Sequence, residues 1–364
     1  MKKRMIRTAA GLLAAVLLFP CSARGLSAQR YILLDGTTGQ VLEEKMADRR
    51  SLIASTTKIM TALLVCEQCN VLDRVRIPRQ AVGIEGSSLY LREGEILTVQ
   101  ELLYGLMLHS GNDAAQALAI YCGGTVEGFV GLMNDKARML GLDETHFANP
   151  SGLDHPAHFS TARDLAVLAA YAMENPIFRK TVSTKTLKIT GRSLKNHNKL
   201  LWRIDGAEGV KTGYTKAAGR ILVSSASRQG RRLIAVTIQA PDDWHDHQIL
   251  LERGFERYQL RQPVAAGEQV GSRTVIGGDR QTVPLLAGED FFCALAPNEQ
   301  TGLSVPGSGF VFAPIFEGAG AGQAYVTLDG QVLGQLPLYY GASVSQTAPK
   351  QRTIWEKFLG GIRS

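Results

Sequence analysis

Residues 52–60, LIASTTKIM, place a lysine three residues after a serine at the start of an apolar segment. From Ser55 to about Cys69 the pattern predicts a helix. Four residues supply its apolar face: Ile59, Leu63, Leu64 and Val65. Because residues three apart lie on the same face of a helix, Lys58 can meet the Ser55 hydroxyl. The pair is either a helix-capping serine with a surface lysine, or a reactive pair in which the lysine activates the serine.

A reactive serine–lysine pair needs a neutral lysine. Serine is a weak nucleophile at neutral pH and requires a base within hydrogen-bond reach. Lysine serves as that base only when burial or a second cation lowers its pKa. An apolar helix start with another lysine nearby would provide both. Because S-x-x-K occurs by chance in many helices, this motif alone favours the capping interpretation.

Two further clusters change that weighting. LMLHSGNDAAQ places SGN, residues 110–112, in a turn between two helical segments, where a hydroxyl and an amide can face one spot. AEGVKTGYTKAAGRILVSSA places KTG, residues 211–213, on a strand. A cation and a hydroxyl together suit a substrate carboxylate, and a glycine lets a substrate backbone approach the strand edge. Each cluster alone could be a helix cap or an ordinary edge strand, but the ordered trio is much rarer.

The three motifs resemble the S-x-x-K, S-D-N and K-T-G set of penicillin-binding proteins and class A β-lactamases. The surrounding sequence resembles the low-molecular-mass penicillin-binding proteins, the serine D-alanyl-D-alanine carboxypeptidases, from residue 30 to about 346. Four stretches carry this likeness: ASTTKIMTALL, GSSLYLREGEILTVQELLYGLMLHSGNDAA, ANPSGLDHPAHFSTARDLA and GVKTGYT. The resemblance implies removal of the terminal D-Ala from peptidoglycan pentapeptides in cell-wall biogenesis, with inhibition by β-lactams. It implies no cofactor and no metal.

The resemblance also implies a role for each motif residue. The Ser55 hydroxyl would attack the carbonyl between the two D-alanines to form an acyl-enzyme, and Lys58 would take its proton. Ser110 would relay a proton to the leaving amine. Lys58 and Asn112 would hydrogen-bond around that relay.

The K-T-G strand would hold the other end of the substrate. Lys211 and Thr212 would bind the terminal carboxylate, with Gly213 beside them. The backbone N–H groups of Ser55 and Tyr214 would form the oxyanion hole, aimed at charge that develops only in the transition state. The oxyanion role needs only the backbone, so the histidine that some relatives carry in place of Tyr214 changes little.

Two departures and three alternatives accompany this assignment. Gly111 replaces the aspartate of S-D-N, and His197 stands in KNHNKLL where some relatives carry arginine. The alternatives are a β-lactamase or a DD-endopeptidase of the same fold, and an inactive peptidoglycan-binding structural protein. Rapid β-lactam hydrolysis needs a positioned water and base, and ANPSGLDHPAHFS offers only Asp154, better explained as a loop-capping carboxylate. The presence of all three sets of functional residues argues against an inactive protein.

The N-terminus has the pattern of a cleaved secretory signal peptide at residues 1–28. Four basic residues precede the apolar run from Ala9 to Phe19, and small residues follow it. Removing this segment removes five basic and no acidic residues, so the formal charge falls from +7 to +2 (7 − 5). Nucleic-acid binding, which needs a concentrated basic face, therefore loses its support. We expect an exported protein at the extracytoplasmic face of the bacterial cell membrane.

The cysteines are few and irregularly spaced: Cys21, Cys66, Cys69, Cys122 and Cys293. This is no disulfide scaffold. Residues 66–69 read as C-x-x-C, for which a redox or zinc role is conceivable, but no second ligand pair accompanies them. The pattern favours ordinary helix-surface or core cysteines.

The remaining periodicity predicts an α/β penicillin-binding domain at 29–259, a small all-β domain at 260–346, and a linker with a helix at 347–364. RYILLDGTTGQVLEEK reads as a hairpin, and DWHDHQILLERGFERYQL reads as a closing helix. Strands at both ends of the first domain suggest that its first and last strands pair in one sheet. Further helices are predicted at Val99–Leu108, Asn112–Tyr121, Val126–Leu140 and Ala162–Met173. Further strands are predicted at Leu187–Ile189, Val210–Tyr214, Arg220–Ala226 and Leu233–Gln239.

The C-terminal segment QRTIWEKFLGGIRS predicts an amphipathic helix. One arc carries its apolar residues: Ile354, Trp355, Phe358, Leu359 and Ile362. The helix either packs on its own domain or anchors the protein at a membrane interface. The resemblance favours the anchor, because such enzymes commonly end in a membrane-binding helix.

Overall fold

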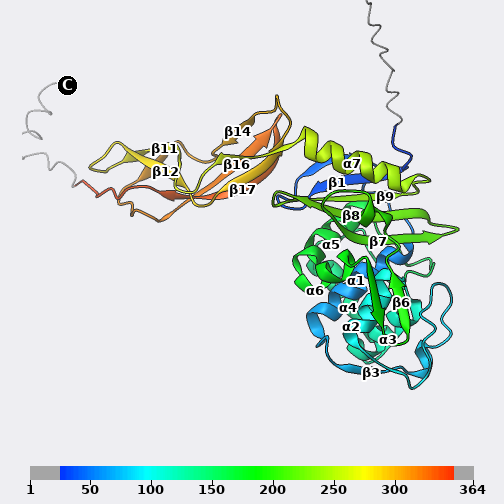
Figure 1. The fold of residues 1–364 in the computed structure, drawn as a ribbon. Helices are drawn as coiled ribbons and strands as arrows, with labels where there is room; N and C mark the ends of the chain where they lie inside the picture. Colours follow the sequence, from blue (N-terminus) through cyan, green and yellow to red (C-terminus); the bar gives the residue numbers. More distant parts are fainter. Residues whose placement is uncertain (1–24, 348–364) are drawn as a thin grey trace, which may run out of the picture.

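The computed structural model describes residues 25–347, which form two domains (Figure 1). Most of the predicted signal peptide and the whole predicted C-terminal helix lie outside the described residues. Within them, no helix combines the length and apolarity needed to cross a bilayer. The larger domain is α/β and the smaller domain is all-β, as predicted.

A five-stranded antiparallel sheet forms the middle of the larger domain, in the order β2-β1-β9-β8-β7. The strands are β1 (Arg30–Asp35), β2 (Val41–Lys45), β7 (Ala207–Thr215), β8 (Gly219–Arg228) and β9 (Arg231–Ile238). The first strand of the domain, β1, pairs with the last, β9, which confirms the prediction of a single sheet closed by both ends of the chain. Strand side chains alternate between faces, so Ile32 and Leu34 enter one apolar core while Leu33 enters a second.

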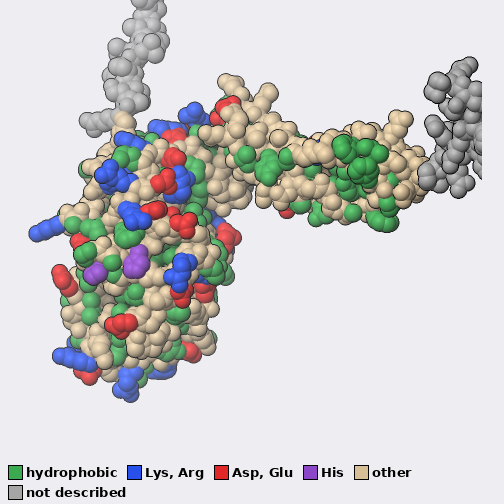
Figure 2. Space-filling model, turned by 180° about the vertical axis from the view of Figure 1, so that it is seen from behind, with side chains coloured by type: hydrophobic (Ala, Val, Ile, Leu, Met, Phe, Trp, Pro, Cys, Tyr) green, Lys and Arg blue, Asp and Glu red, His purple; other side chains and the backbone are tan. Residues whose placement is uncertain are grey.

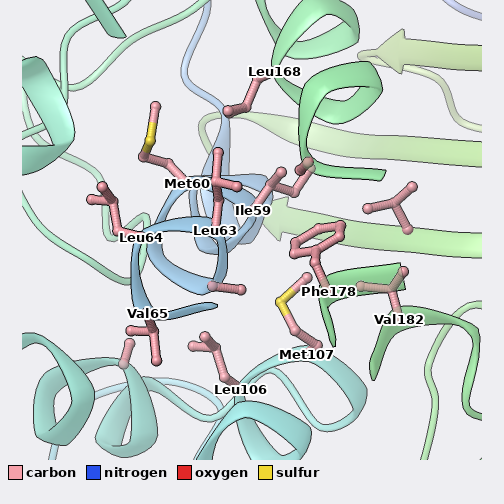
Figure 3. Packing of buried hydrophobic residues seen from close by; sticks show 14 of the residues in the cluster. Ile59, Met60, Leu63, Leu64, Val65, Leu106, Met107, Leu168, Phe178 and Val182 are labelled. Carbon is pink, nitrogen blue, oxygen red and sulfur yellow. The ribbon is translucent and has the colours of Figure 1, made fainter. Parts of the chain in front are cut away.

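Most of the helices lie on one side of this sheet. They are α1 (Lys58–Gln68), α2 (Val99–Leu108), α3 (Asn112–Gly123), α4 (Val126–Met139), α5 (Ala162–Glu174) and α6 (Pro176–Ser183). In Figure 3, Ile59 and Leu63 of α1 lie among Met107 of α2 and Phe178 and Val182 of α6. The sequence predicts one apolar face for α1, but this helix is buried on all sides from Lys58 to Cys66. A helix at the centre of a core can therefore hold Lys58 away from water.

The last helix, α7 (Asp243–Arg257), covers the opposite face of the sheet. Gly254 permits its close approach, because a Cβ atom there would lie 2.6 Å from Leu233 Cδ1 and 2.8 Å from Leu33 Cδ2. The sheet is thus enclosed on both faces. β7 is left as an edge strand, which makes the K-T-G segment accessible from the side.

Several short elements are absent from the sequence predictions. Helix α6 begins at Pro176 behind an Asn175 cap and has only eight residues, too few to show a clear period. Four short strands form two antiparallel pairs: β3 (Arg74–Arg76) with β4 (Ile96–Thr98), and β5 (Thr186–Ile189) with β6 (Arg192–Lys195). Of these four strands, only β5 is predicted from the sequence, as Leu187–Ile189. Three single turns of 3₁₀ helix complete this domain: η1 (Ala54–Thr57), η2 (Arg79–Ala81) and η3 (Lys199–Trp202).

The smaller domain extends from the end of α7 as an elongated arm (Figure 1). It contains a six-stranded sheet in the order β14-β16-β17-β12-β11-β15 and a β10-β13 pair. The strands are β10 (Gln259–Val264), β11 (Gln269–Ile276), β12 (Thr282–Ala287), β13 (Phe291–Leu295), β14 (Thr301–Ser304), β15 (Phe310–Phe312), β16 (Gly320–Leu328) and β17 (Gln331–Tyr340). The Gln40 side chain exchanges hydrogen bonds of 3.0 and 2.9 Å with the Ala294 backbone, joining this arm to the β1–β2 turn.

Candidate active site

The serine and lysine of S-x-x-K meet where η1 runs into α1. Lys58 Nζ lies 2.9 Å from Ser55 Oγ, 2.6 Å from Asn112 Oδ1 and 2.7 Å from the Ser151 carbonyl oxygen. The Lys58 side chain is fully buried, whereas Ser55 is half-buried and faces a cavity. Asn112 and Ser151 therefore hold the Lys58 amine within hydrogen-bond distance of the Ser55 hydroxyl.

The surroundings of Lys58 disfavour its charged form. Burial lowers its pKa well below the ordinary value for lysine, and the nearby charge of Lys211 lowers it further, against a smaller opposing effect of Asp113. Both physical conditions for a basic lysine, burial and a second cation, are thus met. A neutral Lys58 can accept the Ser55 proton at the observed separation.

The SGN turn delivers its groups from the start of α3. Ser110 has a left-handed backbone (φ +63°), and its side chain lines the cavity near Ser55. The Asn112 side chain accepts from Lys58 and donates to the Glu85 carbonyl at 2.5 Å. A Cβ atom on Gly86 would lie 2.7 Å from Asn112 Nδ2, so a glycine is needed where this loop passes the asparagine.

Asp113 holds the loop on the far side of the cavity. Its carboxylate accepts hydrogen bonds from three groups of that loop: Ser88 Oγ at 2.7 Å, Leu89 N at 3.0 Å and Leu91 N at 3.1 Å. A Cβ atom on Gly111 would lie 2.9 Å from Asp113 Oδ1. Any side chain at position 111, including the aspartate of S-D-N, would therefore crowd the Asp113 carboxylate. This gives a physical reason for the glycine in this chain.

The K-T-G segment lies along the edge strand β7. The Lys211 side chain is buried and donates to the Thr212 carbonyl at 2.8 Å, and burial lowers the pKa of Lys211 to about 7. Thr212 and Tyr214 line the cavity. A Cβ atom on Gly213 would lie 3.3 Å from the Ser55 backbone nitrogen, which shows how closely this strand approaches the turn that carries Ser55.

Two histidines border the Lys211 end of the cavity. The rings of His109 and His197 have centroids 5.2 Å apart. Burial lowers the pKa of His197 to about 4, with smaller effects from the charges of Lys211 and His109. His197 is therefore neutral near pH 7 and adds no positive charge beside Lys211.

The cavity has a volume of about 890 Å³, within the range of small-molecule sites. Five predicted site residues line it: Ser55, Ser110, Thr212, Gly213 and Tyr214. The three others, Lys58, Asn112 and Lys211, lie buried around it. Over residues 25–347, no group of three or more His, Cys, Asp or Glu side chains could hold a metal ion.

Comparison with known proteins assigns both domains. The family model of D-alanyl-D-alanine carboxypeptidases matches residues 19–242, and that of the C-terminal domain of penicillin-binding protein 5 matches residues 258–346. The chain belongs to the D-alanyl-D-alanine carboxypeptidase family. This family membership makes it a serine-type hydrolase and a low-molecular-mass penicillin-binding protein, as the sequence resemblance implies.

Individual relatives of this carboxypeptidase agree along most of their length. The D-alanyl-D-alanine carboxypeptidase DacF of Bacillus subtilis is 32% identical over 85% of this chain and 84% of its own. The crystal structures of penicillin-binding protein 5 from Haemophilus influenzae match with a TM-score of 0.77 and 30% identity, over 88% of this chain and 98% of theirs. The Streptomyces K15 DD-transpeptidase matches with a TM-score of 0.61 and 38% identity, over 64% of this chain and 98% of its own.

Residues 151–158, which the sequence analysis did not assign to the site, contact Lys58 and the turn that carries Ser55. The Ser151 carbonyl accepts from Lys58, and Gly152 (φ +88°) would put a Cβ atom 1.8 Å from the Ala54 carbonyl oxygen. His158 Nε2 lies 2.7 Å from Thr57 Oγ1, and burial lowers the pKa of His158 to about 4. The sequence signal that could have assigned this segment to the site is the close likeness of ANPSGLDHPAHFS to the family.

Asp154 in the same segment accepts a hydrogen bond of 3.0 Å from Thr215 Oγ1. The contact ties the loop to the end of β7. It agrees with the interpretation of Asp154 as a loop-capping carboxylate rather than a base for rapid β-lactam hydrolysis.

Proposed function

We propose that the chain removes the terminal D-Ala from peptidoglycan pentapeptides through an acyl-enzyme on Ser55. The observation that supports this most strongly is the fully buried Lys58, whose amine lies 2.9 Å from Ser55 Oγ. A lysine with a strongly lowered pKa is a suitable base for a serine nucleophile. As Ser55 Oγ bonds to the carbonyl carbon between the two D-alanines, its proton passes to Lys58 Nζ.

The carboxylate of the leaving D-Ala binds Lys211 and Thr212. A pKa of about 7 leaves Lys211 partly neutral in the free enzyme, and an approaching carboxylate favours its charged form. The contact thus pairs a buried cation with the one feature that all peptides ending in D-Ala share. It discriminates against substrates whose last residue has no free carboxylate.

The backbone N–H groups of Ser55 and Tyr214 receive the oxyanion. The closeness of Gly213 to the Ser55 nitrogen supports this role, because it brings the strand and the nucleophile's turn to one point. Ser110, which lines the same cavity, passes the proton to the leaving nitrogen. The C–N bond breaks, D-Ala departs, and water then attacks the ester on Ser55 to release the shortened peptide.

We also propose export and membrane association. Residues 1–28 act as a cleaved signal peptide, which agrees with a family whose relatives are named for action on D-alanyl-D-alanine. The apolar arc and basic residues of 352–363 bind the bilayer interface. Together they place the enzyme at the outer face of the cell membrane, where its substrate lies.

Mass spectrometry of the purified mature protein with a pentapeptide ending in D-Ala-D-Ala tests the reaction. We expect the loss of one alanine residue from the peptide, and no loss with Ser55→Ala. An amine acceptor added to the same reaction separates hydrolysis from transpeptidation, the activity for which the Streptomyces K15 relative is named. Transfer of the acyl group to the amine in preference to water would overturn the carboxypeptidase assignment.

A further inference from the structure

The smaller domain exposes an apolar cluster on one edge of its six-stranded sheet. Ile276 of β11 is aligned with Phe312 of β15, and Phe310 lies two residues before Phe312 on this edge strand. Residues aligned across a sheet, or two apart along a strand, lie on the same face. Ile276, Phe310 and Phe312 are 44%, 44% and 66% exposed, and the two phenyl rings lie edge to face at 5.7 Å. We call these three residues the aromatic tip.

The aromatic tip lies where the chain leaves the described residues. Thr347 N donates to the carbonyl of Gly277, the residue after Ile276, at 2.8 Å, and Gln346 bridges to Gly278. Figure 2 shows hydrophobic side chains gathered on the part of this domain that is remote from the larger domain. The continuation of the chain toward residues 352–363 therefore starts beside the exposed rings.

Chain length limits how far apart the tip and that segment can be. A fully extended chain spans about 3.5 Å per residue, so the five steps from Thr347 to Arg352 cover at most roughly 18 Å. This is smaller than the thickness of a bilayer's hydrocarbon core, about 30 Å. If residues 352–363 lie in the interface, the tip is held within reach of the same interface.

We propose that the aromatic tip is a second membrane contact, inserting Phe310 and Phe312 into the lipid interface beside the C-terminal segment. The inference rests on the proposed membrane binding of residues 352–363. Aromatic side chains favour this interfacial region. Together the two contacts fix the arm's orientation at the membrane, and so the position of the catalytic cavity relative to the cell wall.

Charge separates the two contacts. Among the charged residues close in sequence to the tip, two basic and two acidic residues cancel: Arg273, Arg280, Asp279 and Glu317. The C-terminal segment has an excess of basic residues, with Arg352, Lys357 and Arg363 against Glu356. The tip should therefore contribute a salt-insensitive apolar contact, whereas the segment contributes attraction to anionic lipid that salt weakens.

The test compares partition of the full mature chain onto vesicles of phosphatidylcholine alone and of phosphatidylcholine with phosphatidylserine. We expect the double substitution Phe310→Ser and Phe312→Ser to weaken binding to both vesicle types by at least about tenfold, at low and high salt, from lost ring burial. Phe292→Ser is the matched control, because Phe292 is 43% exposed but lies on β13, the strand that contacts the larger domain. Its partition, and the activity of every variant on a soluble peptide, should be unchanged.

The outcomes separate this inference from the proposal on which it rests. Binding by the double variant equal to that of the original chain would overturn the tip contact and leave the C-terminal anchor standing. No vesicle binding by the original chain would overturn both. A loss of self-association in sedimentation, with vesicle binding unchanged, would assign the tip to a second copy of this chain and so contradict a lipid partner.

Discussion

Replacing Lys211 with alanine tests how the enzyme recognises the end of its substrate. The side chain is a buried cation beside Thr212, and a charge-assisted hydrogen bond to a carboxylate contributes about 1.5–3 kcal/mol. Losing it should reduce kcat/KM for a peptide with a free terminal carboxylate by roughly 10- to 150-fold. A peptide amidated at that end never makes the contact and should lose much less.

A second effect of the same substitution must be separated from the first. The charge of Lys211 helps to lower the pKa of Lys58, so its removal leaves Lys58 more often protonated and slows both peptides. This shared loss cancels in the ratio of the two kcat/KM values at one pH. The ratio of carboxylate to amide substrate should therefore fall by roughly 10- to 150-fold, from the carboxylate contact alone.

The assay measures released D-Ala or D-alaninamide from two otherwise identical peptides. Lys195→Ala is the control, because Lys195 lines the same cavity but its Nζ lies 5.7 Å over the Trp202 ring, and its loss should leave the ratio unchanged. An unchanged ratio for Lys211→Ala would show that Lys211 does not bind the carboxylate.

Three further predictions follow from burial, backbone geometry and the chain ends. In a pH profile, kcat/KM for the peptide with a free carboxylate should rise with pH as Lys58 loses its proton, and fall above about pH 7 as Lys211 loses its proton. The amidated peptide should show the rise without the fall. Gly152→Ala should lower the Tm and slow penicillin labelling, because the new Cβ atom would lie 1.8 Å from the Ala54 carbonyl oxygen. The control Gly131→Ala, where a Cβ atom would meet no atom within 4 Å, should change neither; equal melting curves for the two variants would refute the prediction. N-terminal sequencing of the mature protein should show the loss of 23 to 28 residues. Truncation before Arg352 should strongly weaken binding to anionic vesicles and leave only the contact of the aromatic tip; undiminished binding would contradict the anchor.

The sequence predicts best those features that depend on neighbours along the chain. Ser55 and Lys58 are one turn apart, so a local pattern suffices to place the hydroxyl beside the amine. The pairing of β1 with β9 joins segments about 200 residues apart, but it is also predictable, because few arrangements let strands at both ends of a domain bury their apolar faces. The glycine-rich turns after Leu260 likewise predict an all-β domain without reference to distant contacts.

Other features that depend on distant contacts could not be predicted from the sequence. Lys58 donates to the Ser151 carbonyl 93 residues away, and no side-chain pattern marks a backbone oxygen. Asp113 follows the recognised motif directly, yet its role in holding the Ser88–Leu91 loop appears only when that loop is folded against it. The burial of α1 on all sides from Lys58 to Cys66 was also hidden, because a one-sided apolar pattern does not show what covers the other side.

Mass spectrometry of the protein treated with benzylpenicillin tests the central claim, an acyl-enzyme on Ser55 formed with Lys58 as base, most directly. The opened ring keeps its amine tethered and shields the ester from water, so the adduct should be long-lived. We predict one penicillin per chain, mapped to Ser55, with no label in Ser55→Ala and labelling slowed by at least about 10²-fold in Lys58→Ala. A label on any other residue would contradict the mechanism, and rapid turnover of penicillin would instead assign the chain to the β-lactamases.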